Sequence, residues 1–120
     1  MKKLVVIDDE QDFCTLVEMY CNRKGIECKF ANTLLQGMQL VEAFLPDVVI
    51  LDNNLPDGYG WTKVDFLLNT YPNINLNLIT AKKAIDKTSS EYASYDKRVS
   101  FFYKPLSMLQ LNDIIPSDNE

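Results

Sequence analysis

The sequence predicts a doubly wound α/β fold, in which a single parallel sheet of five strands is covered on both faces by five helices. The first observation behind this prediction is that short aliphatic runs alternate with segments whose apolar residues recur at helical spacing. Such alternation is typical of βα units, which build parallel sheets with helices on both sides. The second observation is that the 120 residues contain no repeat, low-complexity tract or linker-like stretch. We therefore expect one domain over residues 1–120.

The expected strands are short runs rich in aliphatic residues. The clearest is Asp47–Asp52, in which four aliphatic residues in a row precede an aspartate. Unbroken aliphatic runs of this length are typical of strands that are buried on both faces. The other runs are Leu4–Ile7, Ile26–Ala31, Leu76–Thr80 and Val99–Tyr103.

The expected helices follow the strands. Gly25 fits the C-terminal cap of the first helix, while Pro46 and Pro72 end the second and third. Residues 85–95 give a fourth helix of weak periodicity, and 106–115 a short final helix before a polar tail at 116–120. The apolar stripes of the first three helices are Phe13, Leu16, Val17 and Tyr20; Leu35, Met38, Val41 and Phe44; and Trp61, Val64, Leu67, Leu68 and Tyr71.

The composition argues against several classes of function. The formal net charge is −5 and basic residues are not clustered, which argues against direct nucleic-acid binding. No apolar stretch approaches the ~20 residues that span a bilayer. Cys14 and Cys21 would lie ~10 Å apart along one helix, too far for a disulfide, so we expect reduced thiols in a cytoplasmic protein. Because the chain has no histidine, its chemistry must rest on carboxylates, hydroxyls and lysines.

Polar residues follow four of the expected strands at the point where each strand ends. Asp8 and Asp9 follow the first strand, Asp52 ends the third, Thr80 ends the fourth and Lys104 follows the fifth. The carboxyl ends of parallel strands share one rim, where ligands bind in open α/β sheets. Two carboxylates ~4 Å apart repel each other by ~4 kcal/mol at an effective dielectric near 20, so such a cluster calls for a cation.

This donor set suits the transfer of a phosphoryl group. Oxygen ligands that leave room for water are those that Mg²⁺ prefers. A bound Mg²⁺ would neutralise an incoming phosphoryl group and orient it for in-line attack by a carboxylate, which would give an acyl phosphate. Lys104 would balance another phosphoryl oxygen as a point charge, and the Thr80 hydroxyl would donate a hydrogen bond to a third.

Five segments together resemble the receiver domains of two-component response regulators. They are Val5–Glu10, Val48–Asp52, Leu55–Gly60, Leu78–Ala81 and Lys104–Leu106. Their order matches that of the family, and the intervals are close to those of the family, with the one before Lys104 slightly long. The resemblance covers nearly the whole chain. It implies a flavodoxin-like sheet with the strand order 2-1-3-4-5.

The resemblance also implies how the acidic residues act. Asp52 would be the phosphoacceptor and a metal ligand. Asp9 would ligate Mg²⁺, or Mn²⁺ in its place, directly, while Asp8 would act mainly through water. Asn54 would contribute its backbone carbonyl to the metal, and its side chain would tune the lifetime of the phosphoryl group. The donor would be a histidine kinase or a histidine phosphotransfer protein, and the output would pass to a downstream protein target or effector domain.

The remaining roles concern the switch. Thr80 would bond the phosphoryl group in the active state, and Lys104 would pair with Asp52 or its phosphate. Phe101 lies where the family has its switching aromatic, which would turn inward when Thr80 moves. Lys82 would tune dephosphorylation together with Asn54, and a cis peptide bond would precede Pro105. Such a domain catalyses its own phosphorylation and dephosphorylation and is not a conventional turnover enzyme.

Some features depart from the family. The segment Lys82–Arg98 matches poorly, and it occupies the surface that meets partners in receivers. A pseudo-receiver that binds without phosphorylation is therefore an alternative. An aspartyl-nucleophile phosphatase is a weaker one, because Asn54 stands where such enzymes have an acid. The final helix lacks the arginines of the common transcription-factor dimers. Ending at Glu120, the chain is either a stand-alone receiver or part of a longer protein.

Overall fold

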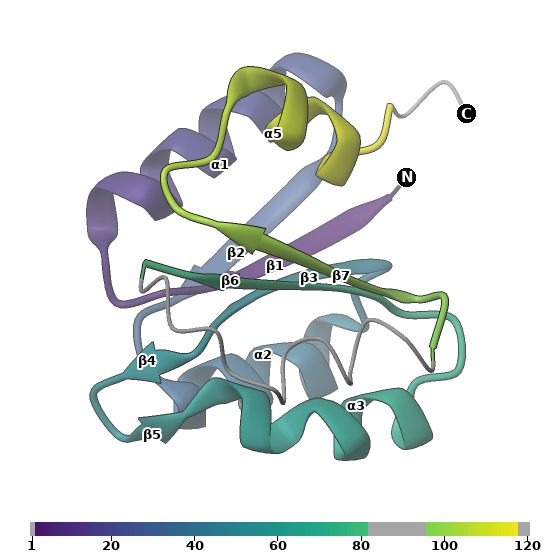
Figure 1. Cartoon of the computed structure of the whole chain (residues 1–120). Helices are drawn as coiled ribbons and strands as arrows, with labels where there is room; N and C mark the ends of the chain where they lie inside the picture. The colour runs from purple at the N-terminus through teal and green to yellow at the C-terminus, as the bar shows by residue number, and fades with distance from the viewer. Residues whose placement is uncertain (1, 82–95, 118–120) are drawn as a thin grey trace.

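A parallel sheet of five strands forms the centre of the computed structural model, which describes residues 2–81 and 96–117. The strands are β1 (Lys3–Ile7), β2 (Glu27–Ala31), β3 (Val48–Asp52), β6 (Asn75–Thr80) and β7 (Val99–Tyr103). They lie in the order β2-β1-β3-β6-β7 (Figure 1). Numbered among themselves along the chain, these strands have the order 2-1-3-4-5 that the sequence led us to expect. The fold class is therefore confirmed.

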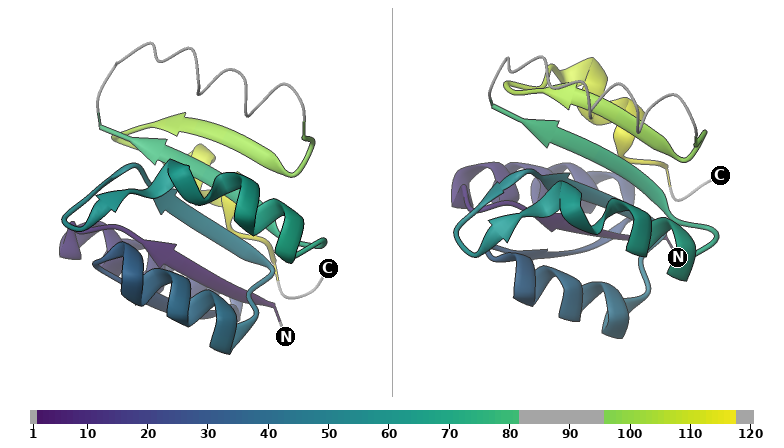
Figure 2. Two further views of the ribbon diagram at one scale, coloured as in Figure 1. Left: turned by 90° about the horizontal axis from the view of Figure 1, so that it is seen from below. Right: turned by 60° about the horizontal axis from the view of Figure 1, so that its bottom comes forward.

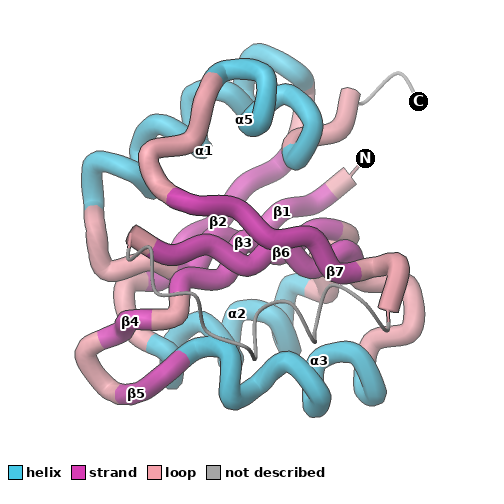
Figure 3. Tube along the Cα trace, viewed as in Figure 1, coloured by secondary structure: helices cyan, strands magenta, loops and turns pink. Residues whose placement is uncertain are grey.

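Two short strands add a feature that the sequence did not predict. β4 (Asn54–Leu55) and β5 (Gly58–Tyr59) form an antiparallel hairpin directly after β3. The hairpin lies outside the main sheet, on the side that also carries α2 and α3 (Figure 3). It follows Asp52 at once, and it therefore shapes the surroundings of the expected phosphoacceptor.

Helices cover both faces of the sheet. α1 (Gln11–Lys24) and α5 (Met108–Ile114) lie on one face. α2 (Leu34–Phe44), the 3₁₀ turn η1 (Gly60–Lys63) and α3 (Val64–Thr70) lie on the other (Figures 1 and 2). The helix expected over residues 85–95 lies outside the described residues. None of the described helices is long and apolar enough to cross a membrane.

The alternation of side chains along the strands divides the core in two. Val5 and Ile7 of β1 pack with the α2 and α3 side, whereas Leu4 and Val6 pack with the α1 and α5 side. All four are fully buried. Successive side chains of a strand point to opposite faces, so a strand that is covered on both faces is apolar throughout.

The predicted helical faces were partly wrong. In α1 the buried residues are Cys14, Val17 and Cys21, while Leu16 is 40% exposed. In α2 the buried face includes Gly37, and Leu35 is 65% exposed. Small residues let both helices approach the sheet closely, and a pattern search that counts only large apolar residues misses them.

Several predicted boundaries also shift. Trp61 lies in η1, because the 3₁₀ turn precedes the regular part of the third helix. The final helix is shorter than 106–115, because Ser107 is its N-cap and forms a capping box with Gln110. Strand β2 begins one residue later than predicted, and β6 begins one residue earlier.

Candidate functional site

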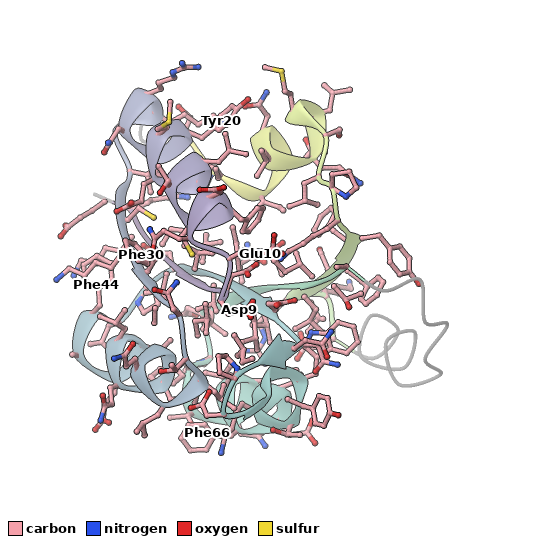
Figure 4. The ribbon with its side chains drawn as sticks, turned by 90° about the vertical axis from the view of Figure 1, so that its left-hand side faces the viewer. Asp9, Glu10, Tyr20, Phe30, Phe44 and Phe66 are labelled. Carbon is pink, nitrogen blue, oxygen red and sulfur yellow. The ribbon has the colours of Figure 1, made fainter. Side chains whose placement is uncertain are left out.

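The polar residues that end the strands meet at one rim of the sheet, as predicted. Figure 4 looks at this side of the molecule, where Asp9 and Glu10 lie between the sheet and α1. Asp8, Asp9 and Asp52 each offer a carboxylate oxygen, and these oxygens lie within 4.8 Å of one another. They come from β3 and from the turn after β1, two neighbouring strands. This all-oxygen set fits a hard divalent cation such as Mg²⁺.

Asp52 is the last residue of an unbroken buried strand and is itself almost fully buried. Its side chain is only 4% exposed, and every residue of β3 is buried. Burial and, next in size, the negative charge of Asp8 together raise the pKa of Asp52 to about 7. Lys104 and the backbone N–H of Asn53 offset part of this rise. The cluster is thus electrostatically unsatisfied in a way that a bound cation would relieve.

Lys104 lies between two acidic partners. Its Nζ is 2.6 Å from Oδ2 of Asp8 and 2.7 Å from Oε1 of Glu10, and it lies over the Phe13 ring. Burial tends to lower the pKa of Lys104, but the hydrogen bonds to Asp8 and Glu10 outweigh it, so that this pKa is raised. The carboxylate partners of Lys104 are therefore Asp8 and Glu10, whereas the sequence led us to expect Asp52. The fully buried Asp8 has the greater need of a counter-charge, and so attracts the ammonium group.

Thr80 and Lys104 are held next to each other by the backbone. Thr80 is 5% exposed, and its carbonyl accepts a hydrogen bond of 2.8 Å from the Lys104 N–H. The peptide bond between Lys104 and Pro105 is cis, as the resemblance implied. The hydroxyl-bearing residue and the cationic residue thus have fixed backbone positions on the rim, beside the acidic cluster.

The loop after Asp52 is tightly held. The N–H of Gly60 donates to the Asn53 carbonyl at 2.9 Å, and that of Trp61 donates to Oδ1 of Asn53 at 3.2 Å. A Cβ atom on Gly60 would come within 2.2 Å of the Asp52 carbonyl oxygen. Glycine is therefore required at position 60, because the loop returns directly onto the backbone of Asp52. Asn54 pairs with Tyr59 in the hairpin inside this closed loop.

The two phenylalanines of β7 lie on opposite faces of the sheet. Phe101 is partly buried against the core on the α2 and α3 side, and Phe102 against the opposite one. The Phe101 ring makes edge-to-face contacts with Trp61, at 5.2 Å between centroids, and with Tyr103, at 4.9 Å. Phe101 is thus already packed inward against the turn that follows the Asp52 loop.

Sequence reasoning missed the contacts that two residues make in the structure. From the sequence, Glu10 stood out only as the end of the segment Val5–Glu10, but in the structure it binds Lys104. Asp57 appeared only as part of the loop motif, but its carboxylate accepts hydrogen bonds from the first turn of α2. Both contacts join residues far apart in the chain, and no local pattern encodes them. Lys82 lies outside the described residues.

A comparison with protein families decides the family to which the chain belongs. The model of the response regulator receiver domain matches residues 4–115. The chain belongs to this family. Members of the family are signalling switches, and receiver domains work with kinases and effector domains in general.

Curated relatives of this receiver domain are longer proteins. The response regulator protein PilR of Pseudomonas aeruginosa is 24% identical over 116 residues, which cover 95% of this chain and 25% of that protein. The transcriptional regulatory protein YclJ of Bacillus subtilis is 29% identical over 110 residues, 91% of this chain and 47% of that protein. The receiver chain thus spans between a quarter and about half of the length of these relatives.

Solved receiver structures share the fold. The beryllofluoride-activated NtrC4 receiver domain matches with a TM-score of 0.79 at 24% identity, covering 96% of this chain and 97% of that one. A response regulator of Burkholderia pseudomallei with a phosphorylated aspartic acid matches with a TM-score of 0.80 at 18% identity, covering 97% and 67%. At these identities the likeness establishes the fold of the receiver domain and nothing more specific.

Proposed function

We propose that this receiver domain is a phosphorylatable switch, in which Asp52 accepts a phosphoryl group from a histidine kinase or a histidine phosphotransfer protein. The observation that carries the proposal is the convergence of three carboxylates within 4.8 Å beside the Lys104 ammonium group. Carboxylates this close stay ionised together only when a cation is shared among them. Asp8, Asp9, Asp52 and the backbone carbonyl of Asn54 would hold Mg²⁺, or Mn²⁺ in its place.

The cation, when bound, supplies positive charge that stabilises both the ionised Asp52 and the oxygens of the incoming phosphoryl group. The carboxylate of Asp52 then forms an O–P bond while the P–N bond to the donor imidazole breaks. The electron pair of the broken bond stays on the imidazole nitrogen, which takes a proton from water. The product is an acyl phosphate on Asp52.

Two other side chains respond to this product. Lys104 pairs with a phosphoryl oxygen, either through its third N–H or in exchange for one of its present contacts with Asp8 and Glu10. The Thr80 hydroxyl donates to a second oxygen. The side chains of Lys104 and Thr80 both move from neighbouring backbone positions, since the N–H of Lys104 donates a hydrogen bond to the Thr80 carbonyl. The change is then read by a downstream protein through direct contacts, and Phe101 is the aromatic that follows Thr80.

A shallow groove beside the rim supports docking of the phosphodonor. It has a volume of about 340 Å³, and its apolar lining includes Phe13, Leu16 and Leu106 next to Glu10 and Lys104. A donor imidazole has to come within bonding distance of Asp52, so the donor protein must cover surface that adjoins this site. Apolar surface with a polar border is what a protein interface of this kind needs.

Incubation with acetyl phosphate and Mg²⁺, followed by intact-mass measurement, tests the proposal. We expect the wild-type chain to gain the mass of one phosphoryl group, and Asp52→Asn to gain none. Glu42→Gln is the matched control, because it removes an exposed carboxylate near the C-terminal end of α2, away from the rim. A mass gain that persists in Asp52→Asn would rule out this acceptor.

The same preparation separates the alternatives. A chain that neither takes up phosphate nor responds to Mg²⁺ through the fluorescence of Trp61, the only tryptophan, would be a pseudo-receiver that binds partners without phosphorylation. Fast multiple-turnover hydrolysis of phosphomonoesters would instead indicate a phosphatase. The switch proposal predicts neither result. It further predicts a cytoplasmic protein, because its donors act there.

A further inference from the structure

The tip of the β4–β5 hairpin is bound to a helix on the other side of the loop. Asp57 lies in the turn of the hairpin, and its Oδ1 accepts from the Leu34 N–H at 2.7 Å while its Oδ2 accepts from the Leu35 N–H at 2.9 Å. These are the first two N–H groups of α2, which have no partner within the helix. The two hydrogen bonds lower the pKa of Asp57, so this carboxylate is ionised at neutral pH.

The start of α2 is a fixed point for the hairpin. Thr33 caps the next free N–H through its hydroxyl, which accepts from Gln36. Further along the helix, Gly37 brings the backbone so close to β1 that a Cβ would lie 2.6 Å from the Ile7 side chain. Ile7 directly precedes Asp8 in the chain. The helix that receives Asp57 is thus packed on β1, the strand that leads directly into Asp8 and Asp9.

The base of the hairpin is fixed separately. Asn53 accepts hydrogen bonds from Gly60 and Trp61, and Leu55 is buried in the core. Asn54, whose carbonyl we assign to the cation, lies between this base and the tip held by Asp57. The loop after Asp52 is therefore connected to the segment of Asp8 and Asp9 in two ways. One is the pairing of β3 with β1 in the sheet, and the other is the contact between Asp57 and α2.

We propose that Asp57 is a positioning residue for the cation site: by clamping the hairpin to the first turn of α2, it fixes Asn54 relative to Asp9 and Asp52. This role rests on the proposed function, because it concerns the same Mg²⁺ site. Asp57 itself does not touch the cation. Its loss leaves the acidic cluster intact and frees the hairpin tip, so that part of the binding free energy is used to order the loop.

Titration of the metal-free 120-residue chain with MgCl₂, followed both by Trp61 fluorescence and by calorimetry, tests this role. We expect Asp57→Ala to weaken Mg²⁺ binding by about tenfold, the low end of the loss when a ligand loses its supporting hydrogen bonds. Asp57→Asn keeps one acceptor oxygen and should fall between Asp57→Ala and the wild type. In phosphorylation by acetyl phosphate, the Mg²⁺ concentration for half-maximal rate should rise more than the maximal rate falls.

Thr33→Ala is the matched control, because it removes a cap from the same helix turn without releasing the hairpin. It should lower the thermal stability and leave the Mg²⁺ affinity close to that of the wild type. Equal affinities for the wild type and both Asp57 variants would overturn the positioning role, and so would equal weakening by Thr33→Ala and Asp57→Ala. If the wild type itself binds no Mg²⁺, the proposed function fails first, and the role of Asp57 fails with it. Asp57→Asn decides the question if Asp57→Ala does not fold.

Discussion

At the scale of single residues, the acidic rim combines burial with unbalanced charge. Asp8 and Asp52 are almost inaccessible to water, and Asp9, which is exposed, completes the cluster. Burial raises the pKa of both Asp8 and Asp52, while Lys104 offsets part of the rise in each. A single ammonium group cannot neutralise three carboxylates. The acidic cluster therefore favours a bound cation. Without one, the buried carboxylates lower the stability of the folded chain.

The raised pKa of Asp52 gives a prediction for the metal-free protein. With a folded-state pKa of about 7 and an unfolded value near 4, the folded chain binds more protons at Asp52 between these pH values. The free energy of unfolding should therefore fall as the pH rises from about 4 to about 7. Asp52→Asn lacks this loss, and should exceed the wild type in stability by up to ~4 kcal/mol at pH 8, since each pKa unit corresponds to ~1.4 kcal/mol.

Urea unfolding in EDTA at pH 4.5 and pH 8 would measure this difference. The two proteins should be similar at the lower pH and differ most at the higher one. Part of the gain comes through Asp8, because removing the charge at position 52 also eases the ionisation of its neighbour. Added Mg²⁺ should stabilise the wild type more than Asp52→Asn and so reduce the gap. A gap independent of both pH and Mg²⁺ would contradict this electrostatic account.

At the scale of elements, the site depends on how closely α2 approaches the sheet. Gly37 faces Ile7, and a Cβ at position 37 would lie 2.6–2.7 Å from three atoms of that side chain. Ile7 is fully buried and branched at Cβ, so it has little freedom to move aside. The glycine therefore reflects packing, although it weakens the intrinsic tendency of the segment to form a helix.

Gly37→Ala should accordingly destabilise the protein. Overpacking of a full core costs ~1–3 kcal/mol, while the gain in helix propensity is only ~1 kcal/mol, so we expect a net loss of up to about 2 kcal/mol. The double variant with Ile7→Val, which removes the closest atom, should recover part of the loss. Gln39→Ala on the exposed side of α2 is the control and should be nearly neutral. An increase in stability in Gly37→Ala would show that the helix can move away from β1.

The elements also show what sequence reasoning can and cannot reach. The strands and the rim residues were predictable, because β3 is an unbroken aliphatic run that ends in Asp52, and parallel strands bring their ends together. The buried face of α1 was not, because Cys14 and Cys21 carry it in place of Leu16. The contacts of Lys104 with Glu10 and of Asp57 with α2 were also beyond reach, since they depend on packing between distant segments.

At the scale of the whole molecule, cationic side chains tie helix ends to distant parts of the chain. Arg98, at the start of β7, donates to the carbonyls of Leu68, Tyr71 and Pro72, at and just beyond the end of α3. On the opposite face, Nζ of Lys24 donates to the carbonyls of Asn112 and Ile115, at 3.1 and 2.7 Å. Both cations satisfy carbonyls that the helices leave free and lie at the negative ends of the helix dipoles.

The bridge from Lys24 fixes the last helix to the first. Lys24→Met keeps most of the aliphatic stem but loses the hydrogen bonds to α5, so we expect a loss of ~0.5–1.5 kcal/mol in stability. Hydrogen exchange should accelerate in the last turn of α5 more than in β3. Arg23→Met is the matched control, because it removes the same charge from the neighbouring position, where the side chain only lies over the Tyr20 ring. Equal effects of the two substitutions would assign the loss to net charge. A larger and localised effect of Lys24→Met would show that this bridge holds the C-terminal helix, and with it the β7–α5 loop that begins at Lys104, against α1.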